Sequence, residues 1–319
     1  MMTKPVRDDR ADLDALIAPY HDLARLVAVV LDRWPEHAGY LRKSFAPRSA
    51  AMMASSDHVA RAVLALAGDR APQVADDYRW LGDRIREEEI EFARSGRYRF
   101  SSFEETNAHV YSDGAFMERY MHGLLFSHVL WYMHASSLHF FRQRLEARVA
   151  PGGRVLEVGS GHGLLLYLAL TDLKLAEAHG WDLSDVSLAQ TRHALRVLGA
   201  EDRAQFALQD MHQVQPGGDA FDLVILSHIL EHLDDPVGAL DRMRGAIAKG
   251  GVLFVNVPLN APMPDHVILL ETPDMAADLL RRGGFNIVEM ATHTTQAMTL
   301  AQALRRQTAV TCSIIAEPA

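Results

Sequence analysis

Apolar runs of β type alternate with helical segments along the second half of the chain, and this alternation constrains the fold more than any other feature. The first run, residues 154–159, follows the turn sequence Pro151-Gly152-Gly153, and the last run is residues 310–318. Alternating strands and helices form βαβ units, in which the strands are parallel and the helices cover both faces of the sheet. The sequence therefore predicts an α/β fold with a doubly wound parallel sheet over residues 151–319.

The same pattern gives the residue ranges expected in this sheet. Strands are predicted at residues 154–159, 176–182, 204–210, 221–227, 251–258, 286–291 and 310–318. Helices are predicted at residues 164–175, 188–198, 236–248 and 273–282, with a helical excursion between residues 291 and 307.

Residues 1–150 contain no strand pattern. Apolar side chains follow helical spacing between Leu23 and Trp34, between residues 56 and 68, and between residues 72 and 91. A further stretch, residues 113–149, is apolar on nearly every face at its centre, which indicates a helix covered by protein on all sides. We therefore expect a helical domain that binds the substrate as a lid, with its boundary to the sheet domain near Pro151.

Composition and charge exclude several classes of function. The 319 residues carry 32 Lys and Arg against 41 Asp and Glu, a net charge of −9, without a basic run that would bind nucleic acid. The single cysteine, Cys312, excludes an intramolecular disulfide and a multi-cysteine metal site. The charged amino terminus predicts no secretory signal, and the short apolar runs predict no membrane span. We expect a cytoplasmic protein that acts on a small molecule, and a homodimer is the assembly to test.

The sequence Glu157-Val-Gly159-Ser-Gly161-His-Gly163 stands where a predicted strand passes into a helix. Glycine lets the backbone turn tightly and approach a ligand, and the first turn of the following helix offers free N–H groups. The spacing G-x-G-x-G, with an acidic residue two positions before the first glycine, differs from the G-x-G-x-x-G pattern of nicotinamide enzymes. A nicotinamide oxidoreductase is therefore not expected.

Polar side chains end the next predicted strands. Asp182 ends the second strand, where a carboxylate can accept hydrogen bonds from both ribose hydroxyls of an adenosine. Asp210 ends the third strand, where an acid can accept the adenine amino group while Met211 packs on the ring. The predicted cofactor-binding residues are Glu157, Gly159, Ser160, Gly161, Gly163, Asp182, Leu183, Asp210, Met211 and Ser227.

The segments EVGSGHG, WD, QDM and FDLVILSHILEHLDDP resemble, in order and spacing, the class I S-adenosylmethionine-dependent methyltransferase domain over about residues 154–319. The resemblance implies a Rossmann-like sheet with S-adenosylmethionine as cofactor and S-adenosylhomocysteine as product. It implies that the glycine turn faces the methionine part of the cofactor, that the acid ending the second strand holds the ribose, and that the acid ending the third faces adenine. Residues 120–131, 161–167 and 255–266 are similar to a narrower bacterial group, the methionine S-methyltransferases and azetidine-2-carboxylate synthases.

The narrower similarity implies an amino-acid-shaped pocket beside the sulfonium of the cofactor. The leading expectation is methyl transfer to a small amino-acid-like acceptor, with methionine sulfur as the most specific one, giving S-methylmethionine. One alternative is a lyase that closes the amino-acid arm of the cofactor into azetidine-2-carboxylate and releases methylthioadenosine. An alternative of another class is a module that binds an adenosyl ligand without catalysis.

Aromatic and polar side chains supply the expected substrate pocket. Aromatic rings can hold a sulfonium by cation–π contact, and polar side chains after the fifth strand can bind the charged groups of an amino acid. The predicted substrate-binding residues are Tyr98, Phe103, Tyr111, Tyr120, Trp131, Asn256, Asn260, Asp265 and His266. The competing interpretation places the aromatic rings in the core and treats the loop as a connector whose polar residues satisfy local turns.

The predicted catalytic residues depend on the acceptor. A thioether acceptor has no proton to lose, whereas an oxygen or ammonium acceptor requires a base, for which His228 at the end of the fourth strand is the candidate. Tyr167, on the helix after the glycine turn, and His134, near the domain junction, complete the predicted catalytic set. His228 and His232 have the spacing of zinc ligands on a helix, but no Glu follows the first histidine as in H-E-x-x-H, so no metal is expected.

Overall fold

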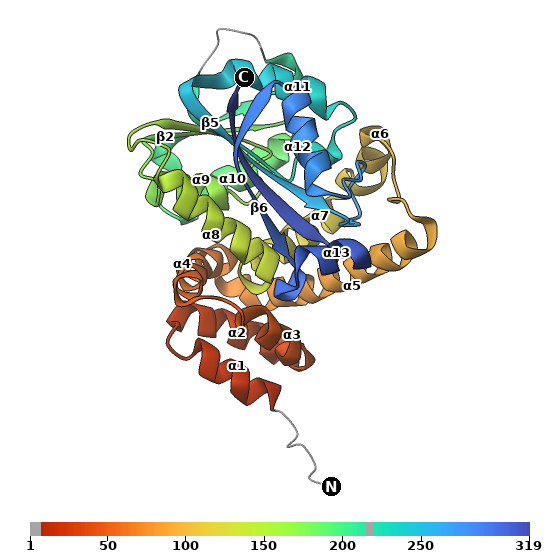
Figure 1. Cartoon of the computed structure of the whole chain (residues 1–319). Helices are drawn as coiled ribbons and strands as arrows, with labels where there is room; N and C mark the ends of the chain where they lie inside the picture. The colour runs from red at the N-terminus through yellow and green to blue at the C-terminus, as the bar shows by residue number, and fades with distance from the viewer. Residues whose placement is uncertain (1–7, 215–219) are drawn as a thin grey trace.

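The computed structural model describes residues 8–214 and 220–319 (Figure 1). Within these residues, seven strands form one sheet in the order β3-β2-β1-β4-β5-β7-β6. The strands are β1 (Arg154–Val158), β2 (Glu177–Asp182), β3 (Ala204–Leu208), β4 (Phe221–Ser227), β5 (Ile247–Leu259), β6 (Phe285–Thr294) and β7 (Val310–Pro318). The predicted α/β fold is confirmed, because the order reverses at β1 as in a doubly wound sheet.

The helices of the amino-terminal region lie along one side of the sheet, and the remaining helices alternate with the strands (Figure 1). The α-helices are α1 (Asp9–Ile17), α2 (His21–Arg33), α3 (Ala38–Phe45), α4 (Ala50–Ala67), α5 (Ala71–Ser95), α6 (Phe103–Thr106), α7 (Gly114–Leu130), α8 (Tyr132–Glu146), α9 (Leu164–Thr171), α10 (Asp185–Val197), α11 (Pro236–Met243), α12 (Pro273–Arg282) and α13 (Leu300–Arg306). Short 3₁₀ or π turns are η1 (Pro35–His37), η2 (Gly68–Arg70), η3 (Asn107–Tyr111), η4 (Glu201–Arg203), η5 (Met211–Gln213), η6 (Leu230–His232), η7 (Arg244–Ala246) and η8 (Thr295–Ala297).

The two faces of the sheet pack against different cores because successive side chains along a strand point to opposite faces. In β4, Leu223 and Ile225 belong to the core that contains helices α9 and α10, whereas Val224 and Leu226 belong to the core that contains α11 and α12. Both sets are fully buried. Central strands therefore read as continuous apolar runs, which is why their ranges could be predicted closely.

Strand β7 departs from the predicted parallel sheet. It pairs antiparallel with β5 on one side and with β6 on the other, so that Asn256 lies opposite Ser313 and Thr292 opposite Cys312. Its amino-terminal end therefore lies at the same edge of the sheet as the carboxyl ends of the parallel strands. The pattern of apolar residues is the same for a buried strand in either direction, so the sequence did not reveal the reversal.

The helical region also differs in detail from the prediction. The single helix expected over residues 113–149 is two helices, α7 and α8, which meet at Trp131 in an extended conformation. The helix expected from residue 56 begins earlier, at Ala50, where the Ser49 side chain accepts a hydrogen bond from the Met52 N–H. Predicted helices at residues 72–91 and 273–282 correspond to α5 and α12.

The helical region and the sheet share one core. A single cluster of buried side chains joins residues of α2, α4 and α8 to residues of β1, β4 and β5. Phe141 of α8 contacts Phe254 of β5 edge to face, with ring centroids 5.0 Å apart. The predicted division into two domains near Pro151 therefore crosses a continuous core, and it stays a prediction. No helix in the described parts of the chain is long and apolar enough to cross a membrane.

Candidate functional site

A cavity of about 1300 Å³ lies between the helical region and the edge of the sheet where the parallel strands end. Its wall on the sheet side comes from residues at or after the carboxyl ends of β1, β2, β3, β4 and β5, and from the amino-terminal end of β7. This edge, at the point where the strand order reverses, is where open α/β sheets bind their ligands. The cavity is therefore the candidate site.

The glycine turn forms one end of this wall. Gly159, Gly161 and Gly163 have φ values of +67°, +49° and +66°, a conformation that side chains with a Cβ rarely adopt. Gly159 and Gly161 line the cavity, and a Cβ on Gly161 would lie 2.8 Å from the Met121 Cε of α7. Gly163 does not line it, because it faces Thr191 of α10. Two of the three predicted glycines thus meet the cavity, where helix α7 closes over them.

Three acidic side chains follow one another along the strand ends. Glu157 is buried beside the glycine turn, its Oε2 atom has no hydrogen-bond partner, and burial raises its pKa well above the ordinary value. Asp182 accepts hydrogen bonds from the Ser184 N–H and the Ser187 hydroxyl, which fix its carboxylate at the end of β2. Asp210 accepts from the His212 N–H. All three line the cavity, together with Ser160, Leu183, Met211 and Ser227.

Helices α5 and α7 form the opposite wall. Their cavity-lining residues recur at intervals of about one helical turn, so each helix presents one face. These residues are Tyr78, Gly82, Asp83, Ile85, Arg86 and Glu89 on α5, and Gly114, Met117, Tyr120, Met121, Leu124 and His128 on α7. Burial raises the pKa of Glu89. Apart from Tyr120, sequence reasoning did not assign these residues to the site. Their helical spacing was visible, but it does not distinguish a face packed on the core from a face that lines a cavity.

A row of histidines lines the cavity, and one of them, His162, belongs to the glycine turn itself. The Nε2 atoms of His128 and His162 lie 2.8 Å apart, and burial lowers the pKa of His128 well below its ordinary value and that of His162 to about 4. His134 packs against His128 and His228, with ring centroids 5.5 and 5.7 Å apart, and burial also lowers its pKa well below the ordinary value. His134 and His228 were both predicted to be catalytic, and the structure places them side by side.

His228 has an unusual backbone. Its φ of +57° is in the left-handed region, which is costly for a residue with a side chain and often marks functional sites. The strand β4 ends immediately before it, at Ser227, and its N–H donates to the Asn256 carbonyl. Its Nδ1–H donates to Glu231 Oε1 over 3.1 Å, which leaves Nε2 as a proton acceptor.

A wall of tyrosine, acid and histidine side chains adjoins this row. Tyr120 donates to Asp265 Oδ1 over 2.8 Å, and Tyr111 donates to Asp265 Oδ2 over 3.3 Å. His232 and His266 lie beside them, with ring centroids 5.1 Å apart. Four of these five residues were predicted to bind substrate, and the structure brings Tyr111, Tyr120, Asp265 and His266 together although they come from separate segments.

The acid nearest these histidines is Glu231, which is fully buried. Burial alone would raise its pKa, but the hydrogen bond from His228 and the neighbouring His232 and His266 lower the pKa to about 2. Glu231 is therefore ionised inside the protein. It was not among the predicted site residues, because the segment EHLDDP that contains it indicates the family and not the role of this side chain.

Several predicted site residues do not line the cavity. Tyr167 of α9 packs on the shared core instead. The Tyr98 hydroxyl accepts from the Ala261 N–H, which anchors the loop after β5. Asn256 bridges α8, β4 and β7 by hydrogen bonds with Ser137, Ser227 and Ser313. Asn260, at a φ of +46°, donates to the Glu271 carbonyl. These contacts hold elements of the cavity wall in place.

The two remaining aromatic residues do line the cavity. Phe103, at the start of α6, packs on Tyr111 with ring centroids 6.0 Å apart. Trp131, at the junction of α7 and α8, donates from Nε1 to the Tyr78 hydroxyl over 2.9 Å and packs on His134. Trp34, His37 and Tyr40 extend this aromatic surface, and sequence reasoning did not place them there.

Comparison with known proteins agrees with this geometry. Residues 156–253 match the methyltransferase domain family model. The chain is similar to a trans-aconitate 2-methyltransferase of Variovorax paradoxus, with 31% identity over 40% of this chain and 48% of that protein. It is also similar to a ubiquinone biosynthesis O-methyltransferase of Xanthomonas campestris, with 33% identity over 43% of this chain and 56% of that protein. The chain thus spans about half the length of these relatives.

The solved structures with a similar fold include a methyltransferase of Geobacter sulfurreducens in complex with S-adenosylhomocysteine. The likeness covers 56% of this chain and 90% of that one, with 19% identity and a TM-score of 0.42. The alignments with the two relatives and with this structure each cover less than three fifths of the chain.

Proposed function

Because the sheet-containing half of the chain is a class I S-adenosylmethionine-dependent methyltransferase domain, we propose that the protein transfers a methyl group to a small molecule held between its glycine turn and its helical region. The observation that carries this proposal is the cavity itself. Pockets that bind one drug-sized ligand measure about 300–1000 Å³, whereas this cavity measures about 1300 Å³ and so has room for a cofactor and an acceptor together.

The residues at the strand ends fit the cofactor. Glu157 carries a buried oxygen without a partner, which an ammonium group such as that of the cofactor's methionine part would satisfy. Asp182 is held by two donors with acceptor capacity left for ribose hydroxyls, and Asp210 with Met211 suits adenine. Bound S-adenosylmethionine supplies an electrophilic methyl group on a sulfonium. The protein's part is to align the acceptor and to exclude water, and helices α5 and α7 cover the cavity for that purpose.

For the acceptor we propose a small amino acid, with methionine sulfur as the first compound to test. The similarity of residues 120–131 and 255–266 to methionine S-methyltransferases supports this choice. So does the chemistry of the wall, which offers a carboxylate at Asp265 and imidazoles at His232 and His266 for the polar ends of an amino acid. A thioether needs no base, so the protein would act only by orientation.

A second candidate is methyl transfer to an oxygen or nitrogen acceptor. It is favoured by His228, whose Nδ1–H is held by Glu231 and whose Nε2 is free to accept a proton inside the cavity. Replacing His228 by Ala separates the two candidates, because turnover falls strongly if a base is needed and mildly if the acceptor is a thioether. One relative is named a trans-aconitate 2-methyltransferase and the other a ubiquinone biosynthesis O-methyltransferase. We therefore include carboxylic acids and phenols in the test panel.

Mass spectrometry of the products tests the proposal. The full chain is incubated with S-adenosylmethionine alone, with methionine, and with panels of other amino acids, carboxylic acids and phenols. S-adenosylhomocysteine together with S-methylmethionine, formed only when methionine is present, supports the proposal. Methylthioadenosine formed without an added acceptor would instead identify a lyase, and cofactor binding without any product would identify a binding module.

An Asp182→Asn variant is the matched control for this experiment. Its carboxylate is the one that fits the ribose, so at cofactor concentrations below saturation this variant should form less product than the unchanged protein.

A further inference from the structure

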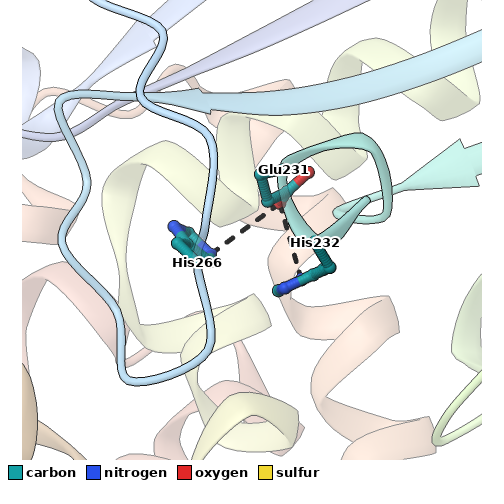
Figure 2. Close-up of side chains that lie close together, drawn as sticks. All are labelled: Glu231, His232 and His266. Carbon is teal, nitrogen blue, oxygen red and sulfur yellow. Dashed lines mark ion pairs between the residues drawn. The ribbon is translucent and has the colours of Figure 1, made fainter. Parts of the chain in front are cut away.

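Three potential metal ligands meet beside the cavity. Glu231 and His232 come from η6, after β4, and His266 comes from the loop after β5 (Figure 2). One ligand atom of each lies within 4.8 Å of the others. His232 and His266 line the cavity, whereas Glu231 is fully buried behind them. The three side chains thus point toward a common centre at the cavity wall.

Both imidazoles are held in the tautomer that binds metals. His232 Nδ1–H donates to the Asp265 carbonyl over 2.9 Å, and His266 Nδ1–H donates to the Ala261 carbonyl over 2.7 Å. The other nitrogen of each ring, Nε2, lies near Glu231, and His232 also interacts with the backbone of His228. Histidines that bind metals almost always carry such a hydrogen bond from the second ring nitrogen to a carbonyl or carboxylate, because it fixes the ring and the tautomer.

The contacts inside this cluster are incomplete without a further atom. The His232 and His266 Nε2 atoms lie 4.0 and 3.9 Å from Glu231 Oε1, which is too long for a hydrogen bond (Figure 2). Glu231 Oε1 accepts one hydrogen bond, from His228, and Oε2 has no partner although it is buried. A buried carboxylate oxygen without a partner is costly, so the structure leaves a place for a cation or a donor here.

We propose that Glu231, His232 and His266 bind a divalent first-row transition-metal ion. Two imidazoles and one carboxylate are the ligand set of catalytic zinc sites and of non-haem iron(II) sites, and Mg²⁺ and Ca²⁺ prefer oxygen ligands alone. Metal–ligand distances of about 2.0–2.2 Å require each ligand atom to move inward by less than about 1 Å. The carboxylate of Asp265, 3.9 Å from His232 Nδ1, adds negative charge close to the ion.

Such an ion would have open coordination positions on its cavity side. An α-amino acid binds a divalent ion through its amino nitrogen, whose ammonium proton is released to solvent, and through one carboxylate oxygen, which places its side chain in a fixed direction. We assign to this metal the role of holding the polar end of the acceptor, and that role rests on the function proposed above. The binding of the metal itself does not rest on it.

The segment of sequence around η6 explains why this site was not expected. His228 and His232 have ligand spacing, but His228 is turned toward Glu231 by its left-handed backbone and donates to it from Nδ1. The second imidazole comes from His266 instead, which lies far along the chain and reaches the cluster through the loop after β5. Spacing within one segment could not reveal this ligand.

Titration with Co²⁺ tests the proposal without relying on activity. The full chain, purified without a polyhistidine tag and dialysed against a chelator, is titrated with Co²⁺ and followed by visible absorption, and the bound metal is then displaced by Zn²⁺. We expect one equivalent of Co²⁺ with ligand-field bands, and at least a 100-fold weaker affinity in Glu231→Gln and in His266→Gln. The matched control is His37→Gln, another buried cavity histidine, which should bind one equivalent as the unchanged protein does.

Stability measurements keep the test decisive if a variant folds poorly. A metal that binds only the folded chain raises the unfolding temperature, and this rise should occur in the unchanged protein and in His37→Gln but not in the two ligand variants. The proposal is overturned if the unchanged, folded protein binds no Co²⁺ or Zn²⁺, or if the ligand variants bind as well as it does. Metal binding without methyl transfer would contradict the proposed function alone. Methyl transfer at an unchanged rate by metal-free protein would contradict only the role assigned to the metal, because the titration tests the site itself.

Discussion

Replacing Gly161 by Ala tests whether the glycine turn serves ligand binding or only the fold. At a φ of +49° an alanine costs roughly 1–2 kcal/mol of stability, because its Cβ crowds the following carbonyl oxygen. The new Cβ would also lie 2.8 Å from Met121 Cε, which is the end of a flexible side chain and can move away at small cost. The free energy of unfolding should therefore fall by little more than the roughly 1–2 kcal/mol that the left-handed backbone costs an alanine.

The chain contains a control glycine whose backbone has the same left-handed conformation. Gly199, after α10, has a φ of +71°, and a Cβ there would meet nothing within 4 Å. Urea unfolding should give both variants a similar loss of about 1–2 kcal/mol. Titration calorimetry with S-adenosylhomocysteine should separate them. We expect Kd to rise at least 10-fold in Gly161→Ala, about 1.4 kcal/mol or more, and to be unchanged in Gly199→Ala.

A double variant separates the two contacts of the new Cβ. Met121→Ala combined with Gly161→Ala removes the clash with α7 but leaves the Cβ in the cavity. If the glycine is needed for close approach of the ligand, the double variant stays as weak a binder as Gly161→Ala. The reasoning is refuted if Gly161→Ala binds as the unchanged protein does, or if Gly199→Ala loses the same affinity.

Three further predictions concern the walls of the cavity. Asp182→Asn should raise the Kd of S-adenosylhomocysteine about 10- to 100-fold, because charge-assisted hydrogen bonds to the ribose contribute about 1.5–3 kcal/mol; calorimetry that shows no change would contradict the assignment. Tyr120→Phe should lower the free energy of unfolding by about 1–3 kcal/mol, since buried Asp265 Oδ1 loses its donor; urea unfolding measures this, and a neutral result would show that water takes the place of the hydroxyl. Burial lowers the pKa of His37 from 6.5 to about 4, so between these pH values the unfolded chain binds a proton that the folded chain does not. His37 should therefore account for up to about 3 kcal/mol of the stability lost as the pH drops from 6.5 to 4, and His37→Gln should reduce the loss measured by urea unfolding by that amount, an expectation that an unchanged pH dependence would overturn.

The sheet was the most predictable part of the molecule. Strand β4 and strand β7 occupy the predicted ranges because each is a short run rich in apolar residues and bounded by polar residues or turns. The direction of β7 was not predictable, since burial on both faces gives the same run in a parallel and an antiparallel strand. The break between α7 and α8 at Trp131 was not predictable either, because no proline or glycine stands there. We attribute it to the packing of the two helices.

The cofactor side of the site was more predictable than the acceptor side. Gly161, Asp182 and Asp210 belong to motifs whose positions at strand ends fix their places at one edge of the sheet. The acceptor side instead combines segments whose contacts depend on how helices pack. His266 meets Glu231 only through the path of the loop after β5, and no periodic pattern carries that information.

The core that joins the helical region to the sheet has a consequence for how the protein unfolds. Phe141 and Phe254 belong to one cluster that spans both halves, so neither half can lose its structure without exposing apolar surface of the other. Heating should therefore give a single cooperative transition rather than two. A fragment cut at Pro151 would leave one face of the sheet uncovered and prone to aggregation. The sheet should therefore keep its binding properties only when the helical region is present.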